Sequence, residues 1–458
     1  MTPAVRPRRR FFCPRNGTPF DGPAPVAGHH AENRRRAQRP VAGRTQTTLP
    51  RPAASRSLPA HMLEAARVFQ QHFGSAPTRL ARAPGRVELL GNHTDYNQGL
   101  VMALAVDKYI TLAGAPREDD RVEVVSRAYP QPACFALDCL EHDPAVPWAD
   151  YVKGVLAGLR ERGAELRGFN AAIHSTIPPG AGLSSSAALL VATALLIRKL
   201  QPYALDAQGR FTPLPPWPGD ELPTLDHAEK LALARLCQAA ENRFVGVNCG
   251  LLDHLSSLFG RASRVILLDF RDTRVDWTPL APDLAVVVCH SGVRHTLVAG
   301  EYNDRRATCE AAARALGVAT LREITLEQLE AGRARLTPHQ YECALHVVGE
   351  NDRVRRGTAL LRREDCIGFG QLLWQSHASS REHFHNSCPE LDTLVELARE
   401  HPACLGARLT GGGFGGATVN LVRRAAVEDF RARLAAGYAA RTGRPFESWL
   451  CEVVDGAA

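Results

Sequence analysis

Three hydroxyl side chains follow a pair of glycines in the stretch Pro178–Ala187, which reads PPGAGLSSSA. Gly180 and Gly182 allow the backbone to turn tightly and to approach a ligand closely. The unpaired N–H groups at the start of the helix that follows, together with its dipole, favour phosphate binding. A serine hydroxyl there can also bind Mg²⁺, which prefers oxygen ligands. The alternative is a glycine turn before a serine-capped helix, and the lack of a lysine after the glycines excludes a Walker loop.

A second stretch, Ala83–Asn97, concentrates polar side chains between glycines. A sugar requires such a set, because each ring hydroxyl both donates and accepts hydrogen bonds and must be satisfied when it leaves water. The stretch is therefore a candidate sugar site, with a solvated polar loop as the commoner alternative. Its polar members are Arg86, Glu88, Asn92, His93, Asp95 and Asn97.

A third stretch, Leu409–Ala417, has five glycines within six positions and runs into a strand-like segment. Glycines at this density allow the backbone to come close to a ligand or to another loop. A flexible linker would look similar, although the flanking strand argues against one.

In this order the three stretches resemble the motifs of the family named for galactokinase, homoserine kinase, mevalonate kinase and phosphomevalonate kinase. Within that family, Ala83–Asn97 is similar to the galactokinase signature, as are Trp148–Gly154 and Cys249–Asp253. The resemblance extends from about Ala60 to the C-terminus. It implies an enzyme that transfers the γ-phosphoryl group of ATP, with Mg²⁺, to the C1 hydroxyl of α-D-galactose.

The resemblance also implies a role for each matching residue. Arg86 would stabilise charge on the transferring phosphoryl group, and Asp253 would accept or orient the proton of the C1 hydroxyl. These roles agree with the chemistry, since phosphoryl transfer needs placement, charge neutralisation and a positioned base. The implied sugar-binding residues are Asn92, His93, Thr94, Asp95, Gly250 and Tyr302. The implied phosphate-binding residues are Gly180, Ala181, Gly182, Leu183, Ser184, Ser185 and Ser186, with Ser186 and Glu241 as Mg²⁺ ligands.

Two residues depart from the galactokinase pattern. That pattern usually has Glu, which contacts the C6 hydroxyl of the sugar, at the position of Asn92, and Asn at the position of Glu88. Rival substrates are therefore a 2-acetamido, 6-deoxy or C6-oxidised galactose, or arabinose. A rival of another class is a non-catalytic sensor of galactose and ATP, against which the intact Ser184–Ala187 and Asp253 favour the enzyme.

Helices and strands must position these motifs, and hydrophobic periodicity predicts both in alternation. The predicted helices are Leu63–Phe73, Tyr151–Arg162, Ala187–Ile197, Asp226–Phe244, Glu301–Leu316, Gln340–Arg362, Cys366–Arg381 and Pro389–Glu400. The predicted strands are Val101–Ala105, Tyr109–Ala113, Val122–Ser126, Phe169–Ser175, Val265–Asp269, Leu284–Cys289 and Ala417–Val422. The proline-rich segment 201–224 is predicted to be a surface loop. The mixture indicates an α+β protein.

A chain of 458 residues exceeds what one core usually serves, so two folded domains are expected. By the resemblance, an S5-like N-terminal domain (62–262) carries the first two motifs. A ferredoxin-like C-terminal domain (263–458) carries the third, and the active site lies in the cleft between them. The longest apolar run, Ala187–Ile197, is too short to span a membrane.

The net charge of +7 is unevenly distributed. Residues 1–61 contain twelve arginines and two acidic residues, a net charge of +10 that leaves −3 on the rest. The folded part is therefore not expected to bind nucleic acid. Residues 1–61 are expected to be disordered, as a real tail, a targeting segment or the product of a start codon assigned ahead of Met62. Twelve scattered cysteines without a CxxC pair indicate a cytoplasmic protein with reduced thiols, and a monomer is favoured.

Overall fold

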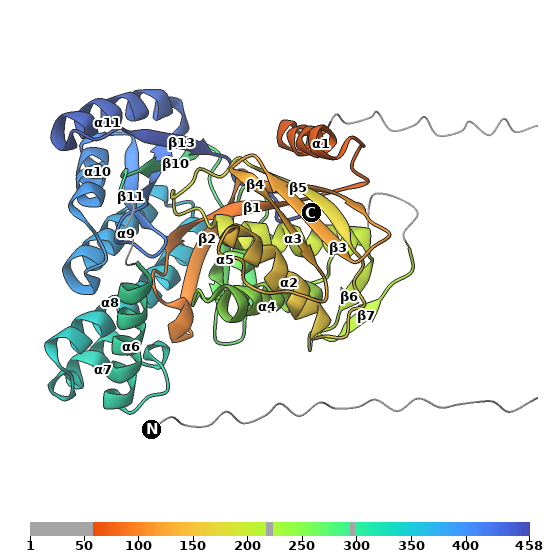
Figure 1. Cartoon of the computed structure of the whole chain (residues 1–458). Coiled ribbons are helices and arrows are strands. Elements are labelled where there is room, and N and C mark those ends of the chain that lie inside the picture. The colour runs from red at the N-terminus through yellow and green to blue at the C-terminus, as the bar shows by residue number, and fades with distance from the viewer. Residues whose placement is uncertain (1–57, 217–222, 294–297) are drawn as a thin grey trace, which may run out of the picture. The chain divides into compact units, whose positions relative to one another are not determined.

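The computed structural model describes residues 58–216, 223–293 and 298–458, and Ser57–Ala458 forms one compact unit (Figure 1). Most of the predicted disordered tail therefore lies outside the described residues. Helix α1 (Ala60–Phe73) begins two residues before Met62, and the ring of His61 stacks on Tyr109 at 4.4 Å between centroids. The helix ends at Gly74, whose φ of 75° suits the left-handed turn that commonly closes a helix.

The larger sheet has seven strands, and its longest strand, β2, hydrogen bonds to three others. It pairs along one edge with β1, and along the other with β5 and β8. The strands are β1 (Arg79–Leu90), β2 (Leu100–Pro116), β3 (Arg121–Ser126), β4 (Tyr129–Ala136), β5 (Phe169–Ser175), β8 (Arg264–Asp269) and β9 (Arg274–Pro279). The two strands predicted at 101–105 and 109–113 are wrong as separate elements. They form one strand, because Asp107 and Lys108 bulge out of the ladder with β1 without breaking it.

Helices α3 (Ser185–Leu200) and α5 (Leu252–Phe259) pack on this sheet, and α2 (Asp150–Arg160) and α4 (His227–Ala239) pack on α3. Helix α1 packs on β2 and β5. Helix α3 is apolar on nearly every side and packs on β1 and β2, as expected for a fully enclosed helix (Figure 1). The Asp226 side chain caps α4 by accepting from the Glu229 N–H at 2.8 Å. The helix predicted to reach Phe244 instead changes to a π-helical turn, Ala240–Val245, which ends at Gly246 with a φ of 84°.

The segment 201–224 is not only a loop. It contains a short hairpin of β6 (Tyr203–Leu205) and β7 (Phe211–Pro213), while residues 217–222 lie outside the described part of the chain. The hairpin forms because the Tyr203 ring is buried, with its hydroxyl donating to the Ala194 carbonyl of α3 at 3.0 Å.

The second sheet is antiparallel, with the order β11-β12-β10-β13. Its strands are β10 (Leu284–His290), β11 (Cys404–Thr410), β12 (Ala417–Arg423) and β13 (Glu447–Cys451). Helices α9 (Cys366–Ser379), α10 (Pro389–Glu400) and α11 (Val427–Thr442) pack with it around an apolar core. The α+β class is thus confirmed. Strands β8 and β9 follow residue 262 yet belong to the first sheet, so the change of sheet falls between Pro279 and Leu284 and not at 262.

A third group of helices, α6 (Val298–Leu316), α7 (Leu326–Ala331) and α8 (Pro338–Arg362), forms its own apolar cluster. Helix α8 starts at a capping box, in which the side chains of Thr337 and Gln340 bond each other's backbone N–H. Among the described residues, no helix combines the length and the apolar character needed to cross a membrane.

Candidate active site

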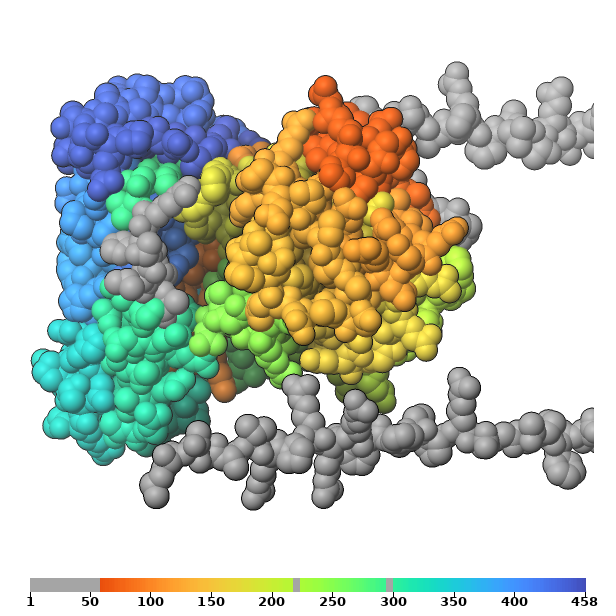
Figure 2. Space-filling view, viewed as in Figure 1, coloured from red at the N-terminus to blue at the C-terminus, as the bar shows by residue number. Residues whose placement is uncertain are grey.

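A cavity of about 400 Å³ lies where β1, α5, α6 and the β11–β12 loop meet. This volume is in the range of small-molecule sites. In Figure 2 the surface is hollowed between the orange and yellow N-terminal part and the blue and green C-terminal part of the described unit. Seven of the predicted site residues line the cavity: Arg86, Asn92, His93, Asp95, Gly250, Asp253 and Tyr302.

Arg86 and Asp253 form the polar centre of this cavity. The Nε of Arg86 donates to Oδ1 of Asp253 at 2.8 Å, and its Nη1 donates to the Gly182 carbonyl at 2.6 Å. Ser184 donates its hydroxyl to the other oxygen of Asp253, Oδ2, at 2.6 Å. Ser184 also has a φ of 59°, a costly backbone conformation for a residue with a side chain. The glycine–serine turn is therefore bonded directly to the predicted base and to the predicted phosphate-stabilising arginine.

The two departures from the galactokinase pattern are bonded to each other. The Asn92 amide donates to Oε1 of Glu88 at 3.0 Å and to the Gly411 carbonyl at 2.7 Å. Its carbonyl oxygen accepts from Asn386 at 2.9 Å. The same Glu88 oxygen accepts from the buried Arg408 at 2.8 Å. Both amide hydrogens of Asn92 are thus used within the protein, so Asn92 can offer a sugar only the remaining capacity of its carbonyl oxygen.

His93 lies in an aromatic corner of the cavity. Its Nε2 is 2.9 Å from the Gly412 carbonyl and its Nδ1 is 2.9 Å from the Tyr96 hydroxyl. Burial lowers the pKa of His93 to about 4, so the ring is neutral near pH 7. Since a carbonyl can only accept, Nε2 carries the hydrogen and Nδ1 accepts from Tyr96. The ring of Tyr302 lies 5.1 Å from that of His93 and closes this side of the cavity.

Asp95 is an enclosed carboxyl group at the cavity wall. Burial, together with the charges of Glu88 and Asp253, raises its pKa to about 7. It packs tightly against Gly250, where an added Cβ would lie 1.8 Å from Oδ2 of Asp95. Only glycine fits at position 250 while Asp95 keeps this orientation.

Thr94 is placed differently from the sequence prediction. Its hydroxyl lies 2.7 Å from both the Gly91 and the Leu100 carbonyls, and it does not line the cavity. Because a threonine hydroxyl has a single hydrogen to donate, these bonds leave it no donor for a sugar. We therefore assign Thr94 to the turn that follows β1.

The predicted phosphate residues Gly180–Ser186 form the turn into α3, outside the lining of the cavity. Gly180 and Gly182 both adopt a left-handed backbone, with φ of 76° and 67°. Ser185 and Ser186 are the first residues of α3, where backbone N–H groups lack helical partners.

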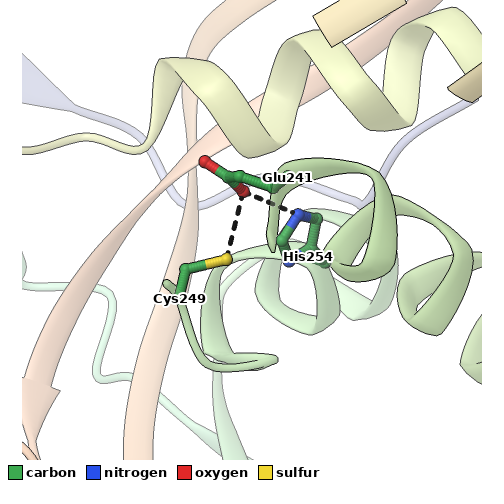
Figure 3. A group of neighbouring side chains, drawn as sticks. All are labelled: Glu241, Cys249 and His254. Carbon is green, nitrogen blue, oxygen red and sulfur yellow. Dashed lines mark hydrogen bonds and ion pairs between the residues drawn. The ribbon is translucent and has the colours of Figure 1, made fainter. Parts of the chain in front are cut away.

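Glu241, the second predicted Mg²⁺ ligand, is buried in the π-helical turn and is not a solvated carboxylate. One of its oxygens, Oε2, lies 3.1 Å from Nε2 of His254 and 3.3 Å from Sγ of Cys249 (Figure 3). Helix α3, which begins with the two serines, packs against this turn.

Several residues that hold the site do not stand out in the sequence. Glu350 of α8 accepts from the backbone N–H groups of Gly91 and Asn92 at 2.8 and 3.0 Å. Arg408 and Asn386 hold Glu88 and Asn92 from positions 320 and 294 residues away. No local motif marks these three residues, because an isolated polar residue in a helix (Glu350), a strand (Arg408) or a loop (Asn386) resembles an ordinary exposed one.

Comparison with known proteins agrees with this geometry. Residues 67–116 match the galactokinase galactose-binding signature, 150–210 the GHMP kinases N terminal domain, and 358–440 the GHMP kinases C terminal domain. Galactokinase of Roseiflexus sp. (strain RS-1) is 42% identical over 393 residues, covering 85% of this chain and 94% of the relative. Galactokinase of Homo sapiens is 40% identical over 404 residues, covering 86% of this chain and 96% of that relative. The crystal structure of Lactococcus lactis galactokinase complexed with galactose superposes with a TM-score of 0.77 at 29% identity, covering 86% of this chain and 98% of that one.

The two sheet-bearing parts, the glycine–serine turn and the glycine loop define a GHMP kinase. Within that class, the chain belongs to the galactokinase family, and it is an ATP-dependent sugar kinase.

Proposed function

We propose that the chain transfers the γ-phosphoryl group of ATP to the C1 hydroxyl of α-D-galactose, giving galactose 1-phosphate and ADP. The observation that carries the proposal is the hydrogen-bonded group of Arg86, Asp253 and Ser184. It joins the turn into α3 to a cavity whose lining includes Arg86, Asn92, His93 and Asp95 of the galactose-binding signature.

The reaction needs a proton acceptor and a cation beside the transferring group. Asp253 takes the proton from the C1 hydroxyl as that oxygen forms its bond to the γ-phosphorus, and the bond from the γ-phosphorus to the leaving ADP oxygen breaks. Arg86 stabilises the charge that spreads over the phosphoryl oxygens. The hydrogen bonds from Arg86 and Ser184 fix both carboxylate oxygens of Asp253, so the base is oriented before the sugar arrives.

Ser186 and Glu241 would hold Mg²⁺ in this proposal. The donor set fits, because both side chains offer oxygen. Cys249 and His254 approach only Oε2 of Glu241, which leaves Oε1 without a hydrogen bond to any described residue. When bound, the ion neutralises charge on the phosphate oxygens.

Replacing Ser186 or Glu241 by alanine should raise the Mg²⁺ concentration needed for half-maximal rate, with galactose affinity changed less. An unchanged Mg²⁺ titration in both variants would remove them from the site.

The test of the activity is ADP release with ATP, Mg²⁺ and a panel of sugars: galactose, 6-deoxygalactose, galacturonate, N-acetylgalactosamine and arabinose. We expect galactose to give the highest kcat/KM.

Asp253→Asn keeps the shape of the side chain but removes the proton acceptor, so turnover should fall about 10²- to 10⁴-fold while nucleotide binding persists. A variant that retains a third of wild-type turnover would refute the role of Asp253. Binding of galactose and ATP without turnover would favour the sensor.

A cytoplasmic location stays a prediction from the cysteine usage, and a monomeric state stays a prediction as well. Size-exclusion chromatography coupled to light scattering checks the second.

A further inference from the structure

Glu241, Cys249 and His254 form a compact group at the edge of the cavity, which Cys249 lines. They lie on the π-helical turn, the segment before α5 and α5 itself (Figure 3). Their potential ligand atoms, a carboxylate oxygen, a thiol sulfur and an imidazole nitrogen, all lie within 4.8 Å of one another. Tetrahedral ligands at about 2.0–2.3 Å from a zinc ion are themselves separated by roughly 3.3–3.7 Å. The two separations from Oε2 of Glu241, 3.1 Å to Nε2 of His254 and 3.3 Å to Sγ of Cys249, are close to that range. The sulfur and the nitrogen lie within 4.8 Å of each other, so movements of about 1 Å would bring all three atoms onto one ion.

His254 carries the independent indication. Its side chain is completely buried, yet neither Nδ1 nor Nε2 makes a hydrogen bond of acceptable geometry with the described residues. Nε2 points toward Oε2 of Glu241 at 3.1 Å (Figure 3). Leaving a buried polar group unsatisfied typically costs about 1–3 kcal/mol, so such a nitrogen calls for an explanation. A bond to a metal ion would give Nε2 of His254 the partner that it lacks.

We propose that Glu241, Cys249 and His254 bind a thiophilic divalent metal ion, Zn²⁺, in a site that shares only Glu241 with the one proposed for Mg²⁺. Cysteine sulfur and histidine nitrogen suit Zn²⁺, whereas Mg²⁺ takes oxygen ligands. Binding releases the thiol proton of Cys249 to solvent as the metal–sulfur bond forms. The thiolate and the Glu241 carboxylate then balance the two positive charges of the ion, and the fourth position is left for water.

The site has a consequence that rests on the proposed function. Because Glu241 is also the proposed Mg²⁺ carboxylate, a zinc ion held by Cys249 and His254 would occupy or reorient it. Zn²⁺ is therefore expected to inhibit phosphoryl transfer, and more Mg²⁺ should be needed to reach the same rate.

The test uses the full chain, stripped of metal by a chelator and titrated with Co²⁺ without ATP or sugar. A tetrahedral site with a thiolate should give the thiolate-to-cobalt charge-transfer band and intense visible bands at about one equivalent, and Zn²⁺ should abolish them. Losing a partner outside the ligand shell weakens metal binding by about 10- to 100-fold. Cys249→Ser and His254→Gln each remove a ligand, so each should weaken Co²⁺ binding by at least about 100-fold. Cys139→Ser, at an exposed cysteine, is the matched control and should keep the bands.

No charge-transfer band in the wild-type protein, or a band that survives in both ligand variants, would overturn the proposal. If one variant fails to fold, as shown by its circular dichroism, the other still decides the outcome. Failure of the zinc site and failure of the kinase are distinguishable, because Co²⁺ binding is read without the reaction. An active kinase without the band refutes only the metal site, and an inactive protein with the band refutes only the proposed function.

Discussion

The Asn92 amide donates a hydrogen bond to the Glu88 carboxylate. A carboxylate and an amide would form the same contact if the two residues exchanged positions, as in the galactokinase pattern. Asn92→Glu alone would place two carboxylates side by side and remove the donors to Glu88 and Gly411. We expect weaker galactose binding and lower stability. Adding Glu88→Asn should restore part of both, with a coupling energy of about 0.5–3 kcal/mol.

This exchange is checked by isothermal titration with galactose and by urea unfolding of the two single variants and the double variant. Additive effects of the two substitutions would show that the contact does not matter for either property.

Asp95 predicts a pH dependence for sugar binding. Its pKa is raised to about 7, mainly by burial, so the free protein loses the anionic acceptor as the pH falls below 7. Ionised carboxylates accept hydrogen bonds roughly twice as strong as neutral groups do. Galactose affinity should therefore be level above pH 7 and fall by up to about tenfold per pH unit below it.

The measurement is the Kd of galactose between pH 5.5 and 8.5, without ATP. Asp95→Asn should give a flat profile at weaker affinity. His93 should add no inflection in this range, because its pKa is lowered to about 4. A wild-type affinity that increases on acidification would contradict the role of the Asp95 anion.

At the scale of elements, the β11–β12 loop contacts Asn92 and His93, in the turn after β1, through the backbone carbonyls of Gly411 and Gly412. Gly413 fixes this path, since its φ is 84° and an added Cβ would lie 2.2 Å from the Asn386 carbonyl oxygen. Gly413→Ala should displace the loop and weaken galactose binding by about tenfold or more, the effect of losing roughly one good hydrogen bond.

Gly443→Ala is the matched control for this substitution. Gly443 also has a left-handed φ, 67°, but nothing lies within 4 Å of an added Cβ. It should lower stability by about 1–2 kcal/mol and leave galactose binding unchanged. Equal galactose affinity in both variants would show that the loop does not position the site.

The sequence predicts elements well where one apolar pattern dominates, and poorly where function or distant packing interrupts it. Strand β5 and helix α10 match their predicted limits, because unbroken apolar or amphipathic runs define them. Strand β11 is missed, since a glycine and the buried Arg408 interrupt its pattern. Helix α11 is missed as well, because alanines and arginines hide its short apolar face.

The candidate site divides in the same way. Local motifs identify Arg86, His93, Asp95 and Asp253, all of which line the cavity. Partners such as Arg408 become visible only in three dimensions, since their charges are satisfied by residues far away in the sequence.

At the scale of the whole molecule, one buried ion pair links the two sheets: Arg408 of β11 and Glu88 of β1. Removing one partner of a buried pair costs about 3–5 kcal/mol, because the other charge is left without compensation. Arg408→Met should therefore lower the free energy of unfolding by that amount.

Urea unfolding of the wild type and of Arg408→Met measures this loss, with Arg433→Met as the matched control. Arg433 pairs with Asp429 on the surface at 3.0 Å, where water screens both charges, so its replacement should have little effect. Similar losses in the two variants would mean that the link between the sheets contributes little.

Because 320 residues separate Glu88 from Arg408, the two partners of this ion pair are synthesised at different times. A ribosome that adds about 5–20 residues per second needs roughly 15–60 s to travel from one to the other. During that interval the nascent chain contains β1, a strand that is buried in the folded protein. Arg408, the partner of the Glu88 carboxylate on that strand, has not yet been synthesised. Asn92 and His93, in the turn after β1, cannot form their bonds to Gly411 and Gly412 until the second sheet has emerged.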